Sequence, residues 1–200
     1  MNIKTVKILA IAGFCTVLSL APSVLQAHEE DSTAPPVFAT GQKIEAPFSL
    51  VDQEGHKVTD KDYHENKIIF FGYTSCPDTC PLTLHKIAKA VESLGPQASK
   101  VQVLFITTDP ERDNPATMKQ YLSSFGPVKI VGLTGTSAQI KKVETEYGVY
   151  VEKRKDDAMT DYEVDHSAVI YLVGPDSTLL DMYGIDSSAE DVAKGIKEKI

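Results

Sequence analysis

Apolar runs alternate with helically spaced apolar positions along most of the chain after residue 47. Residues 67–73, KIIFFGY, are almost continuously apolar, which predicts a short strand buried on both faces. From Pro81 the apolar side chains recur at helical spacing up to Leu94, and Gly95 and Pro96 predict the end of this helix. A buried strand followed directly by a helix is the first unit that the pattern predicts.

The same alternation continues to the C-terminus. Further strands are predicted at residues 101–108, 129–133, 166–174 and 177–184, and further helices at residues 114–126, at residues 136–148 and, after a cap at Ser187 or Ser188, up to residue 200. Residues 48–59 predict a hairpin, and a polar stretch at residues 154–160 predicts a protruding hairpin or loop. This order indicates an α/β domain with a thioredoxin-like mixed sheet flanked by helices, plus an extra hairpin or loop insertion.

The N-terminus has the layout of a secretory signal. Two lysines precede a mainly apolar stretch at residues 8–21, which is shorter than the ~20 residues of a typical membrane-spanning helix. We expect cleavage after Ala27. Because Leu25 occupies a position where a small residue is favoured, an uncleaved membrane anchor is the alternative. Either way the domain is expected to be exported to the periplasm, soluble or anchored to the outer face of the inner membrane.

The remaining chain divides into a lead-in and one domain. Residues 28–44 are rich in proline, alanine and acids and predict a linker, and residues 45–200 predict the folded domain. Loss of residues 1–27, which carry two lysines and no acid, changes the formal charge from −8 to −10. So acidic a surface disfavours nucleic acid and anionic membranes as partners.

Two cysteines remain after that cleavage, Cys76 and Cys80, and they lie between the apolar strand and the helix. The free N–H groups at a helix start stabilise thiolates, so at least one pKa is expected to be lowered. A structural disulfide would close only a short loop and add little stability. A redox pair and a copper(I) site both fit two reactive thiols, and spacing alone does not choose between them.

A copper site could recruit a histidine as a third ligand. His28, His56 and His64 lie in polar stretches and are expected to be solvent-exposed, and helical spacing places His85 off the cysteine face. His166 directly precedes an apolar strand, where a loop entering the sheet can approach the sulfurs. From spacing, His166 is either a ligand or a buried structural histidine.

Three stretches of the chain resemble the Sco (SenC-type) family of thioredoxin-like copper chaperones that assist the assembly of cytochrome c oxidase. They are FGYTSCPDTCPLTL, ITTDPERDNPATMKQYLSSFG and VDHSAVIYLVGPD, and the resemblance covers most of residues 45–195. It implies that Cys76, Cys80 and His166 bind one copper as Cu(I) or Cu(II). It also implies delivery of copper to, or reduction of the cysteines of, the binuclear copper site in oxidase subunit II.

The resemblance assigns further residues and partners. Asp78 corresponds to an acidic residue that could tune the site or contact the partner, and Asp109 matches another family position that is equally consistent with a turn-capping aspartate. Ser75 stands where the family often has histidine, which could shift the redox potential. An upstream copper donor or thiol reductant is implied. The alternative function is that of an enzyme, an exported thiol-disulfide oxidoreductase that uses Cys76 and Cys80.

Overall fold

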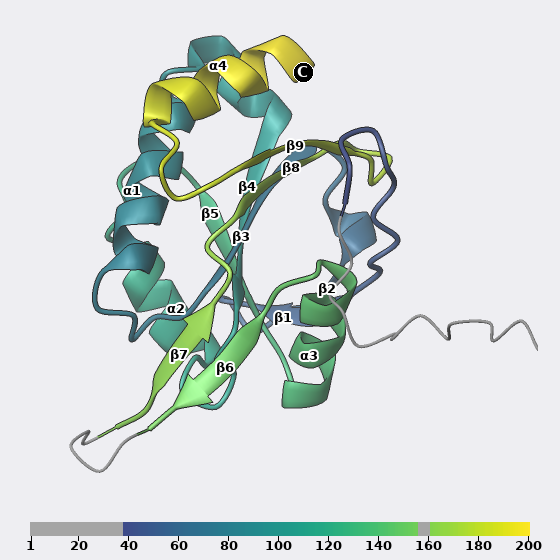
Figure 1. Ribbon diagram of the computed structural model, residues 1–200. Coiled ribbons are helices and arrows are strands. Elements are labelled where there is room, and N and C mark those ends of the chain that lie inside the picture. The colour runs from purple at the N-terminus through teal and green to yellow at the C-terminus, as the bar shows by residue number, and fades with distance from the viewer. Residues whose placement is uncertain (1–37, 156–160) are drawn as a thin grey trace, which may run out of the picture. The chain divides into compact units, whose positions relative to one another are not determined.

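A seven-stranded mixed sheet forms the centre of the computed structural model, which describes residues 38–155 and 161–200. The strand order is β2-β1-β5-β4-β3-β8-β9 (Figure 1). The strands are β1 (Ser49–Asp52), β2 (Lys57–Thr59), β3 (Asn66–Gly72), β4 (Val101–Thr107), β5 (Ile130–Thr134), β8 (Ile170–Val173) and β9 (Leu179–Tyr183). Only β3, β4 and β5 run parallel to one another, and the outer pairs are antiparallel. The predicted α/β fold with a mixed sheet is confirmed.

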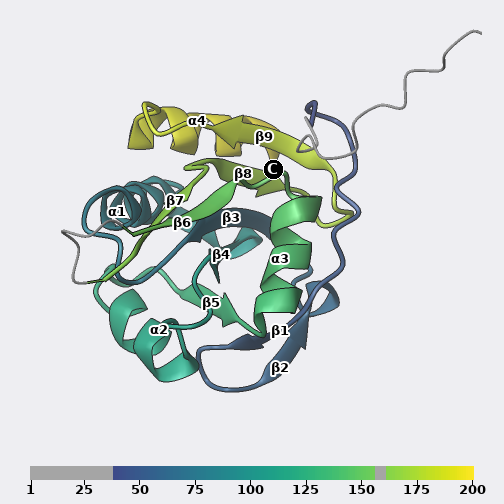
Figure 2. The same ribbon diagram turned by 60° about the horizontal axis from the view of Figure 1, so that its bottom comes forward.

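Helices cover both faces of this sheet (Figures 1 and 2). They are α1 (Thr79–Glu92), α2 (Pro115–Leu122), α3 (Ser137–Glu146) and α4 (Ala189–Lys199), with short 3-10 turns at Asp60–Asp62 and Gly95–Lys100. Along β3, Ile68 and Phe70 pack with α1, α2 and α4, whereas Ile69 and Phe71 pack with α3. Successive side chains of a strand point to opposite faces, so the unbroken apolar run at residues 67–73 is explained by burial on both sides.

The predicted insertion is a second, two-stranded sheet. It consists of β6 (Val151–Arg154) and β7 (Glu163–His166), which pair antiparallel with Val151 opposite His166. The hairpin extends away from the main sheet in Figure 1. Its tip, residues 156–160, lies outside the described residues. The hairpin therefore carries His166 on an element that is separate from the strand leading to the cysteines.

Two of the differences from the predicted element boundaries affect the surroundings of His166 and Cys80. The strand expected at residues 166–174 is divided, because His166 ends β7 while β8 begins at Ile170 in the main sheet. The helix expected from Pro81 begins two residues earlier, at Thr79, which places Cys80 in its first turn. Element boundaries are the least reliable part of a prediction from sequence patterns.

The N-terminal predictions fall largely on residues that the structure does not describe. The signal at residues 1–27 and residues 28–37 of the linker lie outside the described residues and stay predictions. Gly41 and Gln42 are hydrogen-bonded to the backbone of Leu179 in β9, so the chain is attached to the sheet from there onward. Within residues 38–155 and 161–200, none of the helices has the length and apolar character to cross a membrane.

Candidate metal centre

The two cysteines lie where the central strand β3 gives way to helix α1. Cys80 is fully buried in the first turn of α1, and Cys76 is half-buried in the preceding loop. Both are free thiols. Gly72 ends β3 directly beneath them, and a Cβ atom at this position would lie 2.8 Å from Cys80 Sγ. The absence of a side chain at Gly72 lets the Cys80 sulfur rest against the strand.

Cys76 has the environment of a stable thiolate. Its Sγ accepts a hydrogen bond from the Cys80 backbone N–H at 3.4 Å. Hydrogen bonding from the Cys80 thiol lowers the pKa of Cys76 to about 3, with further contributions from His166 and the backbone N–H groups of Cys80 and Asp78, against the opposing effect of burial. The backbone N–H groups at the helix start therefore add to the lowering of this pKa, whereas the largest contribution comes from the Cys80 thiol.

Cys80 has the opposite character. Hydrogen bonding to Cys76, burial and the negative charge of the Cys76 thiolate all raise the pKa of the Cys80 thiol. The pair therefore consists of one accessible thiolate and one buried, protonated thiol. This difference arises from position, since only Cys80 lies inside the helix and against the sheet.

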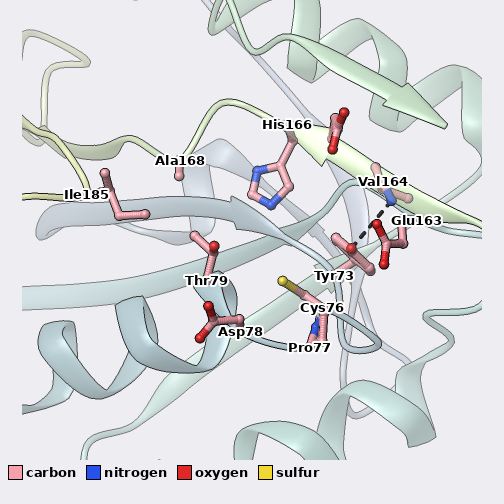
Figure 3. A pocket seen from close by; sticks show the side chains of 11 residues that line it. Tyr73, Cys76, Pro77, Asp78, Thr79, Glu163, Val164, His166, Ala168 and Ile185 are labelled. Carbon is pink, nitrogen blue, oxygen red and sulfur yellow. Dashed lines mark hydrogen bonds between the residues drawn. The ribbon is translucent and has the colours of Figure 1, made fainter. Parts of the chain in front are cut away.

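His166 reaches the sulfurs from the end of β7. Its Nε2 lies 3.4 Å from Cys80 Sγ, and its Nδ1 lies 3.1 Å from the carbonyl oxygen of Ser167. A carbonyl oxygen only accepts, so Nδ1 carries a hydrogen, and Nε2 is the ring nitrogen that faces the sulfurs. Tyr73 and Phe70 hold the imidazole edge-to-face, with ring centroids 5.9 and 6.3 Å away. Figure 3 shows the imidazole above Cys76.

The other candidate residues do not join this group. His56 and His64 are exposed, and His85 is exposed with its ring against Phe125. His28 lies outside the described residues. In the part of the chain that the structure describes, no three His, Cys, Asp or Glu side chains are already arranged to hold a metal ion. Cys76, Cys80 and His166 are linked by pairwise contacts instead.

Asp78 and Asp109 occupy different environments. Asp78 is exposed, and its carboxylate extends away from the Cys76 sulfur in Figure 3, so it acts on Cys76 through its backbone N–H. Asp109 is fully buried. Its carboxylate contacts Arg112, Lys153 and the hydroxyl of Tyr162, so it is more than a turn-capping residue.

Asp113 was not among the predicted site residues. This fully buried carboxylate accepts hydrogen bonds from the Thr74 N–H at 3.0 Å, from the Thr74 hydroxyl and from the Thr107 hydroxyl at 2.7 Å. It thereby fixes the loop that leads to Cys76. A signal was present: β3 and β4 are parallel neighbours, so the polar residues after β4 meet the cysteine loop at one edge of the sheet.

A pocket opens above Cys76 with a volume of about 360 Å³. Cys76, His166 and Tyr73 are among the residues that line it. The Tyr73 hydroxyl accepts a hydrogen bond from the Val164 N–H at 3.4 Å. This hydrogen bond ties the hairpin to the cysteine loop (Figure 3). The thiolate is therefore accessible to a small ion or to a partner's side chain.

Comparison with known proteins gives consistent matches. A model of the SCO1/SenC family matches residues 38–200. Protein sco1 of Schizosaccharomyces pombe is 41% identical over 153 residues, which are 74% of this chain and 58% of that protein, so the chain spans little more than half of this relative. Relatives from mouse and human are matched over 61% and 50% of their lengths.

Solved structures match over most of the chain. The structure of Bradyrhizobium japonicum ScoI with copper bound is 44% identical with a TM-score of 0.70, and the match covers 81% of this chain and all of that one. The structure of BsSco, described as a member of the Sco family of cytochrome c oxidase assembly proteins with a disulfide switch, is 25% identical with a TM-score of 0.62, over 82% and 96% of the chains. Since the SCO1/SenC model matches the entire described domain, the chain belongs to the SCO1/SenC family.

Proposed function

We propose that the protein binds one copper ion, as Cu(I) or Cu(II), through Cys76 Sγ, Cys80 Sγ and His166 Nε2. It then delivers this copper to the binuclear copper site of cytochrome c oxidase subunit II, or reduces the cysteines of that site. The observation that carries the proposal is the 3.4 Å approach of His166 Nε2 to Cys80 Sγ, with Nδ1 engaged by a carbonyl. A histidine held through Nδ1 in this way is the usual arrangement of a metal ligand.

The donor set suits copper. Thiolates are soft ligands that favour Cu(I), and imidazole binds copper in both oxidation states. Metal bonds of ~2.3 Å to sulfur and ~2.0 Å to nitrogen, as for zinc, place two ligand atoms of one ion roughly 3.5 Å apart. The separation of His166 Nε2 and Cys80 Sγ is close to that value. Small movements of Cys76 would complete the three-ligand site.

The relatives support the same function. Copper is bound in the Bradyrhizobium japonicum ScoI structure, and the BsSco description names cytochrome c oxidase assembly. We infer an exported, periplasmic location in which an upstream copper donor or thiol reductant loads the site. Analysis of the exported protein by N-terminal mass measurement tests this, because cleavage after Ala27 predicts His28 as the first residue.

The protein's own residues can both hold and release the ion. Cys76 is already a thiolate, so it can bind first from the open pocket. Cys80 loses its proton as it binds, and His166 Nε2 accepts no proton while it is a ligand. Oxidation of the two thiols to a disulfide would remove both sulfur ligands, so copper binding requires the reduced protein.

Anaerobic titration of the reduced protein with Cu(I) tests the three-ligand site. We expect one equivalent to bind, and we expect Cys76→Ser, Cys80→Ser and His166→Ala each to lower the affinity at least tenfold. His85→Ala is the matched control, since His85 lies against Phe125 and away from the sulfurs. If His166→Ala leaves both the Cu(I) affinity and the Cu(II) spectrum as they are in the wild type, the three-ligand site is wrong.

A second candidate function is thiol-disulfide exchange. It is favoured by the pairing of an accessible thiolate, Cys76, with a buried thiol, Cys80, which is the arrangement of an attacking and a resolving cysteine. This function predicts turnover on a model disulfide that does not depend on His166 as a ligand. Comparison of the copper content of the purified protein with its rate of disulfide reduction distinguishes the two.

A further inference from the structure

The pocket above Cys76 has an apolar side and an acidic side. Ile185 and Ala168 lie to one side of the His166 imidazole, with the exposed carboxylate of Asp78 below them, and Glu163 lies to the other side (Figure 3). The thiolate of Cys76 lies between the two sides. A segment that places a thiol at Cys76 would therefore meet an apolar surface in one direction and a carboxylate in the other.

The apolar side of the pocket carries the exposed side chain of Ile185, and exposed Leu82 lies on α1 outside the pocket lining. Ile185 and Leu82 are 51% and 62% exposed, among the most exposed large hydrophobic side chains of the described residues. Leu82 follows the pocket residue Asp78 by one helical turn, and its backbone N–H donates to the Asp78 carbonyl. Lys86, one turn further along α1, donates to the backbone carbonyl of Ile185 and so holds this loop against the helix. This contact uses the Ile185 backbone, so it remains available when the side chain is replaced.

The carboxylates of the acidic side are only partly paired with a cation. Glu163 and Asp165 both line the pocket, and their side chains are 48% and 44% exposed. The Arg154 guanidinium contacts both carboxylates. It lies 2.8 Å from that of Asp165 but 3.9 Å from that of Glu163, so the ion pair with Glu163 is the weaker one. Among the described residues, no lysine or arginine lines this pocket. Glu163 is thus available to a cation from outside.

We propose that this pocket docks a thiol-bearing segment of a partner protein in one orientation, with an apolar side chain on Leu82 and Ile185 and a lysine or arginine on Glu163. The inference rests on the proposed function, because the docked thiol is the group that would exchange with Cys76. Exposed apolar area supplies affinity, while the opposite charges steer and orient the segment. The proposal thereby names the partner's chemistry on each side of its cysteine.

Binding of designed peptides to the reduced, metal-free protein tests the docking surface separately from copper. The probe is a short peptide with a central serine in place of cysteine, two leucines on one side and two lysines on the other, made in both chain directions. A control peptide carries glutamine in place of lysine. Binding is followed by amide chemical shifts, and we expect saturable shifts at the pocket residues for one direction of the lysine peptide.

Substitutions with matched controls test the acidic side and the apolar side of the pocket separately. We expect Glu163→Gln to weaken the lysine peptide about threefold and the glutamine peptide hardly at all, and Ile185→Ser to weaken both about fivefold. Glu198→Gln and Met182→Ser remove an exposed acid and an exposed apolar side chain outside the pocket, and they should leave binding unchanged.

The outcomes separate the two proposals. The docking surface is overturned if no saturable shift is seen, if neither pocket substitution alters binding, or if the two control substitutions weaken it equally. Failure of the Cu(I) titration with peptide binding intact would instead overturn the copper site, since the peptide experiment contains no metal.

Discussion

The hydroxyl of Tyr162 donates a hydrogen bond to the fully buried carboxylate of Asp109 over 2.8 Å. Tyr162 immediately precedes β7, and Asp109 follows β4 of the main sheet. Two cations also lie over the Tyr162 ring, with the Arg112 guanidinium 3.8 Å and the Lys153 ammonium 4.6 Å from its centroid. This cluster attaches the hairpin that carries His166 to the loop beside the cysteines.

Replacement of Tyr162 by phenylalanine keeps the ring and removes the hydroxyl. We expect the free energy of unfolding to fall by about 1 to 2 kcal/mol, because the hydrogen bond to a charged carboxylate is lost. Urea denaturation measures this. Tyr150→Phe is the control, since the Tyr150 hydroxyl contacts Glu152 at the exposed surface, and a change within about 0.5 kcal/mol is expected there. Equal losses in the two variants would contradict a special role for the Tyr162 cluster.

Substitution of Asp113 is expected to destabilise the protein more than its place in a loop suggests. Asp113→Ala leaves the Thr74 N–H and the Thr74 and Thr107 hydroxyls without their acceptor, at a cost of about 2 to 4 kcal/mol. Asp113→Asn keeps one oxygen and should cost less. Urea denaturation gives both values, with exposed Asp186→Ala as control. A neutral Asp113→Ala would show that the cysteine loop is held by other contacts.

The strand, loop and helix around the cysteines could be predicted from the sequence because their signals are local. The apolar run at residues 67–73 and the helical spacing after Pro81 depend only on neighbouring residues. The reactive thiol pair follows from the same signals, since its pKa difference arises from the hydrogen bond between two cysteines that are close in sequence, from burial and from the helix start.

The approach of His166 to Cys80 could not be predicted in this way. The two residues are 86 positions apart, and their contact depends on how the β6–β7 hairpin attaches through Asp109 and Tyr162. Spacing left His166 open between a ligand and a structural residue, and the family resemblance favoured the ligand. The role of Asp113 was missed for a similar reason, because its hydrogen-bond partners lie on other segments.

Glu144 is expected to make the free energy of unfolding depend on pH in one direction. Burial raises the pKa of Glu144 above its ordinary 4.5, with Lys141 opposing the shift. The folded protein holds this proton more tightly than the unfolded chain, so its stabilising contribution is complete below pH 4.5 and is lost as the pH rises through the folded pKa. Glu144→Gln should therefore gain stability relative to wild type as the pH rises. Urea midpoints from about pH 4 to about pH 8 measure the difference. A constant difference, as expected for exposed Glu198→Gln, would contradict it.

Cys76 should react as a thiolate over a wide pH range. With its pKa lowered to about 3, the rate of alkylation by iodoacetamide should change less than about twofold between about pH 5 and pH 8. An ordinary thiol with a pKa of ~8.5 would gain about tenfold per pH unit over that range. Mass spectrometry identifies the modified residue, and Cys76→Ser should abolish the fast phase. Rates that climb steeply with pH would show that the Cys80 and His166 contacts do not stabilise the thiolate.

Gly72 sets the position of the Cys80 sulfur. In Gly72→Ala the new Cβ would lie 2.8 Å from Cys80 Sγ and 2.9 Å from the Phe105 ring, so the sulfur must move. We expect a stability cost of about 1 to 3 kcal/mol and, because the sulfur moves relative to His166, a shifted Cu(II) spectrum.

Gly132→Ala is the matched control for that substitution. Its Cβ would lie 2.6 Å from Leu122 Cδ1 and 2.9 Å from Met118 Cε, under α2 in the same sheet and away from the thiols. It should cost comparable stability and leave the Cu(II) spectrum unchanged. If both alanines shift the spectrum alike, the effect comes from general loosening of the sheet, whereas a shift confined to Gly72→Ala ties copper coordination to the placement of the Cys80 sulfur against β3.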